Sequence, residues 1–309
     1  MIQIPEYYVK NINRMFGNEG KAWVENIPDI LNKYMGKFKL TQLKIIDKLC
    51  VNFVLMAKSE IYGDVMLKIG IPGSDIQREI TALLLYNGKY VCKCYEYDRE
   101  DRIILLERLL PGTSLHKVQN RKEKVEIFID LMNKVLIRRV KDKVINLPEY
   151  KDVLNRASKY VIYNYSEKYP DFIELIRLAD EKYKEIQKLI LPKYIIHADL
   201  HHDNILLHCD KRIAIDPHGL FGEKVIETTR FIKNEIRKDK DLKSGIIEVV
   251  ELISTKIDEP KELIYKMLFI DFVLSTCWSI EDNVEEKAIL EQMKKCEIAL
   301  ELLNENSNY

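Results

Sequence analysis

The sequence predicts an α+β fold, with an antiparallel sheet in the first third of the chain and helices in most of the remainder. Between Phe38 and Leu106, short runs rich in apolar and β-branched residues alternate with turn signals, which is typical of strands. From about residue 121, apolar residues recur at helical spacing within long charged segments. A chain of 309 residues is long enough for two domains, and we place them at residues 1–108 and 109–309.

The composition is that of a soluble globular protein, with 47% apolar and 32% charged residues. Lys+Arg and Asp+Glu both number 49, so the formal net charge is zero and gives no support to nucleic acid or an anionic membrane as a partner. No signal peptide is evident, and no uninterrupted apolar run has the length of a membrane span. The six cysteines form no Cys-x-x-Cys pair. We therefore expect a cytoplasmic protein.

The first 38 residues predict a helical or irregular leader. Apolar residues from Trp23 to Tyr34 follow helical spacing. Pro28 lies inside this segment, so we expect the helix to break or restart there. Strands are then predicted at Leu43–Ile46, Asn52–Ala57 and Val65–Ile69.

Lys68 is the first candidate site residue, because it lies in the otherwise apolar strand Val65–Ile69. A lysine in such a strand is costly to bury unless it has an anionic partner. Glu79, in the helix predicted to start at Ser74 or Asp75, is the obvious partner, with phosphate oxygens as the other. The alternative is a lysine at the end of an exposed edge strand.

Helices are expected throughout the second domain. The segment Lys124–Val140 is amphipathic, and Pro170 separates two further helices at about 149–168 and 170–190. Four more are expected near 224–237, 242–256, 260–280 and 284–304.

The stretch Tyr194–Pro217 interrupts these helices with three short strands, each beside a polar residue: Asp199, Asn204 and Asp216. Phosphoryl transfer needs such a set, because one Asp orients the attacking hydroxyl while an Asn and a second Asp hold Mg²⁺ on the nucleotide phosphates. The alternative is a surface loop that happens to be rich in Asp and His.

His197-Ala198-Asp199, the following Asn204 and the later Asp216 resemble the catalytic loop and metal-binding Asp of the kinase-like superfamily, in its aminoglycoside phosphotransferase branch. The resemblance implies a bilobal protein-kinase-like fold, ATP and Mg²⁺ as cofactors, and Asp199 as the base. Asn204 and Asp216 would hold the metal. Lys68 and Glu79 would serve the nucleotide, and the segment with Glu107 and Leu109 would be the hinge whose backbone meets adenine.

Three further segments are similar to the streptomycin 6-kinases and the hydroxyurea phosphotransferases grouped with them. They are Gly17–Trp23, Ala214–Glu223 with the downstream Glu227 and Arg230-Phe231, and Val273–Asp282. Trp278, Glu281 and Asp282 in the last segment could hold cationic groups by cation–π contact and charge-assisted hydrogen bonds, and streptomycin carries guanidinium groups. The alternative is a core Trp followed by an acidic helix terminus, with Asp282-Asn283 capping the last helix.

The turn Asp47–Asn52 departs from the kinase pattern because it has no glycine, so backbone amides cannot approach phosphates as they do in a Gly-x-Gly loop. Phosphate binding would then depend on Lys68, Mg²⁺ and Asn52.

The function indicated is ATP-dependent phosphorylation of a hydroxyl on a small, cationic, aminoglycoside-like molecule. The alternatives are a kinase of the same fold that acts on a metabolite or hydroxyurea, and a nucleotide-binding regulatory pseudokinase. The presence of Lys68, Glu79, Asp199, Asn204 and Asp216 together argues against a pseudokinase.

Overall fold

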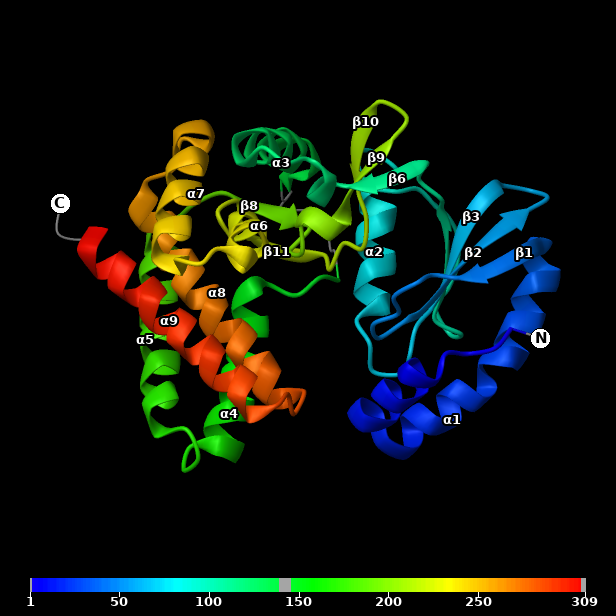
Figure 1. Cartoon of the computed structure of the whole chain (residues 1–309), viewed down its shortest axis with the longest axis horizontal. Coiled ribbons are helices and arrows are strands. Elements are labelled where there is room, and N and C mark those ends of the chain that lie inside the picture. The colour runs from blue at the N-terminus through cyan, green and yellow to red at the C-terminus, as the bar shows by residue number, and fades with distance from the viewer. Residues whose placement is uncertain (1, 139–145, 307–309) are drawn as a thin grey trace. The chain divides into compact units, whose positions relative to one another are not determined.

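The computed structural model describes residues 2–138 and 146–306, and the chain divides into two compact units (Figure 1). Unit 1 comprises the residues up to Thr113 together with Leu206–His218, and unit 2 comprises Ser114–Ile205 and the residues from Gly219 onward. The domain boundary that the sequence predicts between residues 108 and 109 remains a prediction.

Unit 1 is built on a five-stranded antiparallel sheet with the strand order β1-β2-β3-β5-β4. Its strands are β1 (Leu40–Ile45), β2 (Phe53–Ser59), β3 (Gly63–Ile69), β4 (Cys94–Asp98) and β5 (Ile103–Glu107). Helix α2 (Ile76–Tyr86) lies between β3 and β4 in the chain. A second sheet, almost wholly in this unit, has the order β10-β9-β6, with β6 (Pro111–Ser114), β9 (Ile205–His208) and β10 (Lys211–Ala214).

The leader forms helix α1 (Glu6–Phe38), which buries Ile27, Leu31 and Tyr34 in the same core as the inner face of the sheet. The predicted break at Pro28 is wrong, because the helix continues through Pro28 and the non-helical backbone angles within α1 occur at Gly17. A proline removes one helical hydrogen bond, and we attribute the intact helix here to the packing of the apolar side chains on both sides of it.

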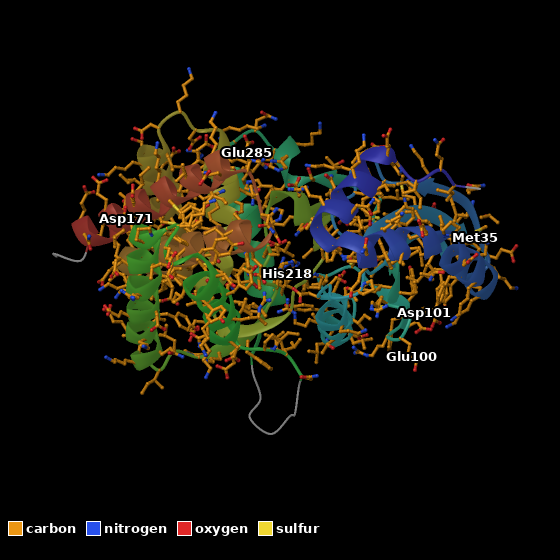
Figure 2. The ribbon with its side chains drawn as sticks, turned by 90° about the horizontal axis from the view of Figure 1, so that it is seen from below. Met35, Glu100, Asp101, Asp171, His218 and Glu285 are labelled. Carbon is orange, nitrogen blue, oxygen red and sulfur yellow. The ribbon has the colours of Figure 1, made fainter. Side chains whose placement is uncertain are left out.

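Contacts with the β4–β5 turn hold the C-terminal half of α1. The Tyr34 hydroxyl donates hydrogen bonds to Asp98 at 2.6 Å and to Asp101 at 2.8 Å, and Lys33 pairs with Asp101. Figure 2 labels Met35 on α1, and Glu100 and Asp101 in the β4–β5 turn. The leader is therefore an integral part of unit 1.

Unit 2 is mainly helical. Its helices are α3 (Arg121–Val135), α4 (Tyr150–Tyr165), α5 (Pro170–Lys188), α6 (Ile226–Glu235), α7 (Leu242–Ile257), α8 (Lys261–Glu281) and α9 (Glu286–Asn306). Three single turns of 3₁₀ helix are η1 (Leu115–Lys117), η2 (His202–Asn204) and η3 (Ile236–Lys238). A small antiparallel sheet has the order β11-β8-β7, with β7 (Ile137–Arg138), β8 (Lys193–Ile196) and β11 (Leu220–Glu223).

Helix α8 is the central helix of unit 2, with α4, α5, α6, α7 and α9 packed around it (Figure 1). Among the described residues it is the one helix long and apolar enough to cross a membrane, but most of it is buried inside the structure. Length and composition of this kind are also typical of a core helix, so the finding carries no membrane assignment.

The predicted helix Lys124–Val140 is wrong at its C-terminal end. Helix α3 ends at Val135, and Ile137 then pairs with Ile195 of β8. Pairing with β8 takes precedence over the helical pattern of the apolar residues, a tertiary effect that local spacing does not contain. Val140 lies outside the described residues.

Candidate nucleotide and catalytic sites

Lys68 and Glu79 form a buried ion pair in unit 1. The Lys68 ammonium lies 2.8 Å from one Glu79 carboxylate oxygen and 2.7 Å from the other, and each residue is only 6% exposed. Lys68 lies on β3, the middle strand of the sheet, and not on an exposed edge strand. The predicted pairing of strand lysine and helix glutamate is therefore confirmed as a contact, while its nucleotide-binding role stays a prediction.

Asp216 completes this group, since one of its carboxylate oxygens lies 3.2 Å from the Lys68 ammonium. Burial lowers the pKa of Lys68, but the charges of Asp216 and Glu79 outweigh burial and raise it, so the ammonium is fully charged. The chain reaches Asp216 from β10, whose last residue Ala214 exchanges backbone hydrogen bonds with Tyr90 and Cys92. The Asp216 side chain is about half exposed and can meet a ligand.

The predicted hinge follows β5. Glu107 is the last residue of this strand, and its carboxylate accepts a hydrogen bond from the Lys93 N–H at 3.3 Å. The neighbouring Arg108 and Leu110 amides donate to Asp64 and to His208, respectively. Within the part of the chain that the structure describes, the Leu109 N–H makes no hydrogen bond, so it is available to a ligand such as adenine.

The glycine-free turn between β1 and β2 is held by two tyrosines at the start of α1. The Tyr8 hydroxyl donates to the Val51 carbonyl at 2.8 Å, and the Tyr7 hydroxyl accepts the Leu49 N–H at 3.1 Å. The side-chain oxygen of Asn52 is buried and has no hydrogen-bond partner among the described residues. A buried oxygen without a donor is costly, and a bound donor would satisfy it.

The catalytic-loop candidate lies in unit 2 between β8 and β9. Ala198 adopts a left-handed backbone conformation, with φ at 64°, just before Asp199. The Asn204 amide nitrogen donates to both the backbone carbonyl and the carboxylate of Asp199, each at 3.0 Å. These two bonds fix Asp199 and Asn204 as a pair, and they leave the Asn204 side-chain oxygen without a partner among the described residues.

Helix α6 supports this loop with Glu227, Phe231 and Glu235, which share one helix face because they are spaced four residues apart. The buried Glu227 carboxylate accepts the N–H groups of His197 and of Ala198, the latter at 3.0 Å. Burial raises the pKa of Glu227 to about 7, although these donors oppose the rise.

Further along the same face, Glu235 accepts a hydrogen bond from His202 Nε2 at 2.6 Å, and the His202 ring stacks on Phe231. Burial would raise the pKa of Glu235, but hydrogen bonds from His202, Lys124 and Arg121 lower it to about 2. Burial lowers the pKa of His202, so the neutral ring is the donor to Glu235.

Arg230 links the base candidate to Trp278, one of the predicted substrate residues. Its Nε lies 3.9 Å from an Asp199 carboxylate oxygen, and its guanidinium lies over the Trp278 ring, 4.9 Å from the centroid. Of the other predicted substrate residues, Glu281 pairs with Arg156 at 3.3 Å. Asp282 follows the last residue of α8, and α9 begins only at Glu286, so Asp282 ends α8 and does not cap the last helix.

Sequence reasoning missed a buried charged group next to Arg230. The Asp271 carboxylate pairs with Lys233 and accepts a hydrogen bond from Tyr150 at 3.2 Å, and Arg230 Nε lies 3.8 Å away. The signal was present, because Asp271 interrupts the otherwise apolar run from Met267 to Leu274 in α8. A carboxylate in such a run predicts a buried cationic partner.

The donor atoms fit Mg²⁺. Asn204 offers a carboxamide oxygen, and Asp216 offers the carboxylate oxygen that does not face Lys68. Mg²⁺ takes few protein ligands of this hard oxygen type and completes its shell with phosphates and water. No cluster of three or more His, Cys, Asp or Glu ligands occurs in residues 2–138 and 146–306.

Solved structures share this fold. The choline kinase LicA from Streptococcus pneumoniae is 13% identical, with a TM-score of 0.66 over 89% of this chain and 99% of that one. A choline/ethanolamine kinase family protein from Mesorhizobium loti is 14% identical, with a TM-score of 0.65 over 88% of this chain and 95% of that one. The predicted kinase-like α+β fold is thus confirmed.

Comparisons of the sequence with known proteins identify its family. The streptomycin 6-kinase of Streptomyces glaucescens is 22% identical over 72% of each chain, and that of Streptomyces griseus is 19% identical over 92% of each chain. Residues 54–283 match the family described as aminoglycoside/hydroxyurea antibiotic resistance kinase. The chain belongs to this family, which confirms the resemblance found in its sequence.

Proposed function

We propose that this kinase transfers the γ-phosphoryl group of ATP to a hydroxyl of a small molecule, with Asp199 as the base. The observation that carries the nucleotide half of the proposal is the buried Lys68 ammonium between Glu79 and Asp216. An ammonium fixed in this way is suited to binding the oxygens of a polyphosphate. The orphaned Asn52 oxygen and the unbonded Leu109 N–H are further groups in unit 1 that a nucleotide would satisfy.

The proposed reaction conserves the proton and the electron pairs. The acceptor hydroxyl gives its proton to the Asp199 carboxylate while its oxygen forms a bond to the γ-phosphorus. The bond from that phosphorus to the β–γ bridging oxygen breaks, and ADP leaves. Asn204 holds the Asp199 carboxylate in place by its hydrogen bond.

Mg²⁺ would be held by Asn204 and Asp216, and when bound it neutralises the charge of the phosphate oxygens. Asp216→Ala should abolish Mg²⁺-dependent binding of a non-hydrolysable ATP analogue in calorimetry. Unchanged affinity would contradict the role given to Asp216.

An aminoglycoside is the first candidate acceptor, because the sequence relatives are streptomycin kinases and Trp278 lies beside Arg230 near the proposed base. With an aminoglycoside as the acceptor, its cationic groups would contact Trp278, Glu281 and Asp282. However, Arg230 already covers the Trp278 ring and Arg156 already pairs with Glu281, so the acceptor would have to displace or share these contacts.

A metabolite acceptor is the second candidate, and a specific observation favours it: four cationic side chains line the pocket next to Arg230. Steady-state assays with ATP and a panel of streptomycin, other aminoglycosides, hydroxyurea and hydroxylated metabolites separate the candidates. Stimulation of ADP release by streptomycin alone supports the first, and stimulation by a metabolite alone supports the second. No stimulation, together with retained nucleotide binding, supports a regulatory pseudokinase. A cytoplasmic location, where ATP is abundant, stays a prediction.

A further inference from the structure

His201 lies two residues after Asp199 in the candidate catalytic loop, and both of its ring nitrogens face polar groups. Its Nδ1 accepts a hydrogen bond from the backbone N–H of Asp203 at 3.3 Å. Its Nε2 lies 3.4 Å from Oδ2 of Asp199, and the His201 side chain is only 16% exposed. One imidazole ring thus connects the start of η2 to the proposed base.

The hydrogen bond at Nδ1 fixes the position of the ring proton. A ring nitrogen that accepts a hydrogen bond carries no proton, so the proton of the His201 ring is on Nε2. Nδ1 does not donate to the side chain of Asp203 instead, because Oδ2 of that carboxylate lies 3.9 Å away, beyond hydrogen-bond distance. The Nε2–H group is therefore the donor that faces the Asp199 carboxylate.

Two donors meet at one oxygen of the proposed base. The Asn204 amide nitrogen lies 3.0 Å from Oδ2 of Asp199 and 3.4 Å from His201 Nε2. Two N–H groups this close together are favourable when both donate to the same acceptor, and a carboxylate oxygen has two lone pairs to receive them. Hydrogen bonds to a charged carboxylate are also stronger than those between neutral groups. His201 and Asn204 together therefore hold the carboxylate in one orientation.

A histidine is an unusual residue at this position if capping is its only role. His201 is the N-cap of η2, where its side chain accepts the Asp203 N–H. Asn, Asp, Ser and Thr are the residues preferred at helix N-caps, and each supplies such an acceptor from a shorter side chain. The cap uses Nδ1 alone. The ring nitrogen that the cap does not need is thus the one that lies beside the proposed base.

From this geometry we infer that His201 is a positioning residue for phosphoryl transfer: its Nε2–H holds the Asp199 carboxylate in the orientation that meets the acceptor hydroxyl. The inference rests on the proposed function, in which Asp199 is the base. A base held in place is more effective than one that rotates freely, because proton transfer depends on hydrogen-bond geometry. The proton of the acceptor goes to Asp199, and the ring proton of His201 stays on Nε2.

Two variants separate the positioning role from the capping role. His201→Asn keeps an acceptor for the Asp203 N–H but has no atom at the position of Nε2, whereas His201→Gln places an amide donor near that position and loses the short cap. We expect kcat of His201→Asn to fall roughly tenfold or more with KM for ATP unchanged, and His201→Gln to restore most of this loss. A lower kcat for the Gln variant than for the Asn variant would overturn the inference.

Stability should follow the opposite order, because it depends on the cap. His201→Asn should unfold at the same urea concentration as the wild type, and His201→Gln at a lower one. His116→Asn is the control, since it removes a different ring that lies 3.2 Å from the Asp203 carboxylate, and it should retain wild-type kcat within about threefold. A loss of kcat that follows the loss of stability across these variants would show a purely structural role and overturn the inference.

Nuclear magnetic resonance of the full-length protein tests the hydrogen bond without turnover. The chain has six histidines, and comparison with His201→Gln identifies the ring signals of His201 in protein labelled with nitrogen-15 histidine. We expect the Nε2–H tautomer, and Asp199→Ala should shift the Nε2–H signal of His201. A proton on Nδ1, or an unshifted signal, would overturn the inference. Absence of phosphoryl transfer to every acceptor would contradict the proposed function, and the spectrum would still decide the contact between His201 and Asp199.

Discussion

The candidate catalytic loop at His197–Asn204 and the turn at Asp47–Asn52 are both short irregular segments beside a strand, but they are supported differently. Two carboxylates of α6, Glu227 and Glu235, hold the loop through its backbone and through His202. The tyrosine hydroxyls of α1 and the buried Leu49 hold the turn. The loop therefore depends on buried charge, whereas the turn depends on packing and neutral hydrogen bonds.

Substitutions of the residues that support the two segments should therefore differ in size and in pH dependence. A buried charged group is expensive to unpair, so substitutions beneath the loop should be severe and pH-dependent. A neutral hydroxyl contributes about 1 kcal/mol, so substitutions beneath the turn should be mild and insensitive to pH. Three substitutions test the contrast.

Glu227→Ala should have the largest effect of the three. It leaves two buried N–H groups, those of His197 and Ala198, without an acceptor, at about 3 kcal/mol in unfolding free energy. Because these residues directly precede Asp199, kcat should fall at least tenfold. Urea denaturation and steady-state kinetics measure both quantities. Glu227→Gln keeps one acceptor and should lose about half as much stability, and wild-type behaviour of the alanine variant would contradict the support assigned to α6.

Glu235→Gln should reduce the free energy of unfolding by about 2–3 kcal/mol at pH 7, since the pKa of Glu235 is lowered to about 2 in the folded protein from an ordinary 4.5. A lowered carboxyl pKa stabilises the fold above pH 4.5, and this contribution declines as the pH falls toward 2. The gap between wild type and variant should thus narrow by about 1 kcal/mol between pH 7 and pH 4.

Glu248→Gln is the matched control for Glu235. Glu248 pairs with the same Arg121 guanidinium at 2.6 Å, but its side chain is 58% exposed. An exposed pair contributes little, so this variant should differ from wild type by less than about 0.5 kcal/mol at either pH. A gap for Glu235→Gln that stays constant with pH would show that charge does not hold the loop.

Tyr8→Phe should have the smallest effect. It removes the hydrogen bond to the Val51 carbonyl and costs about 1 kcal/mol of stability. If the turn serves the nucleotide, KM for ATP should rise a few-fold with kcat unchanged, and the change should be the same at pH 6 and pH 8. Tyr163→Phe, at an 88% exposed tyrosine, is the control. A kcat loss in the Tyr8 variant as large as that of Glu227→Ala would abolish the contrast.

Local pattern predicted most of the secondary structure, because strands and helices here keep their periodicities. The helices after residue 220 were placed to within a few residues of α6 to α9. The two errors, at Pro28 and at the end of α3, both involve long-range packing or pairing. Ile27 and Leu31 of α1 share a core with the sheet, and Ile137 pairs with Ile195 of β8. Neither the sheet residues that share a core with Ile27 and Leu31 nor Ile195 lies within the local window from which each helix was inferred.

The contact of Lys68 with Glu79 was predictable, because a charge interrupts an apolar strand there. A motif fixes the residue type and spacing of Asp199, Asn204 and Asp216, and their roles stay predictions. The loop's support was only partly visible. Glu227 and Arg230 belonged to a recognised pattern, but Glu235 looked like any solvated helix carboxylate. Its role follows from Arg121, Lys124 and His202, which are brought to it by tertiary structure alone.

In the proposed reaction, Asp199 accepts the proton of the acceptor hydroxyl during phosphoryl transfer from ATP. Transfer of labelled γ-phosphate to the best acceptor of the panel should show kcat of Asp199→Ala reduced by roughly 10²–10⁴-fold, with affinity for the ATP analogue unchanged. Asp203→Ala, at an exposed neighbour in the same loop, should retain wild-type kcat within a few-fold. Wild-type turnover by Asp199→Ala would contradict the account.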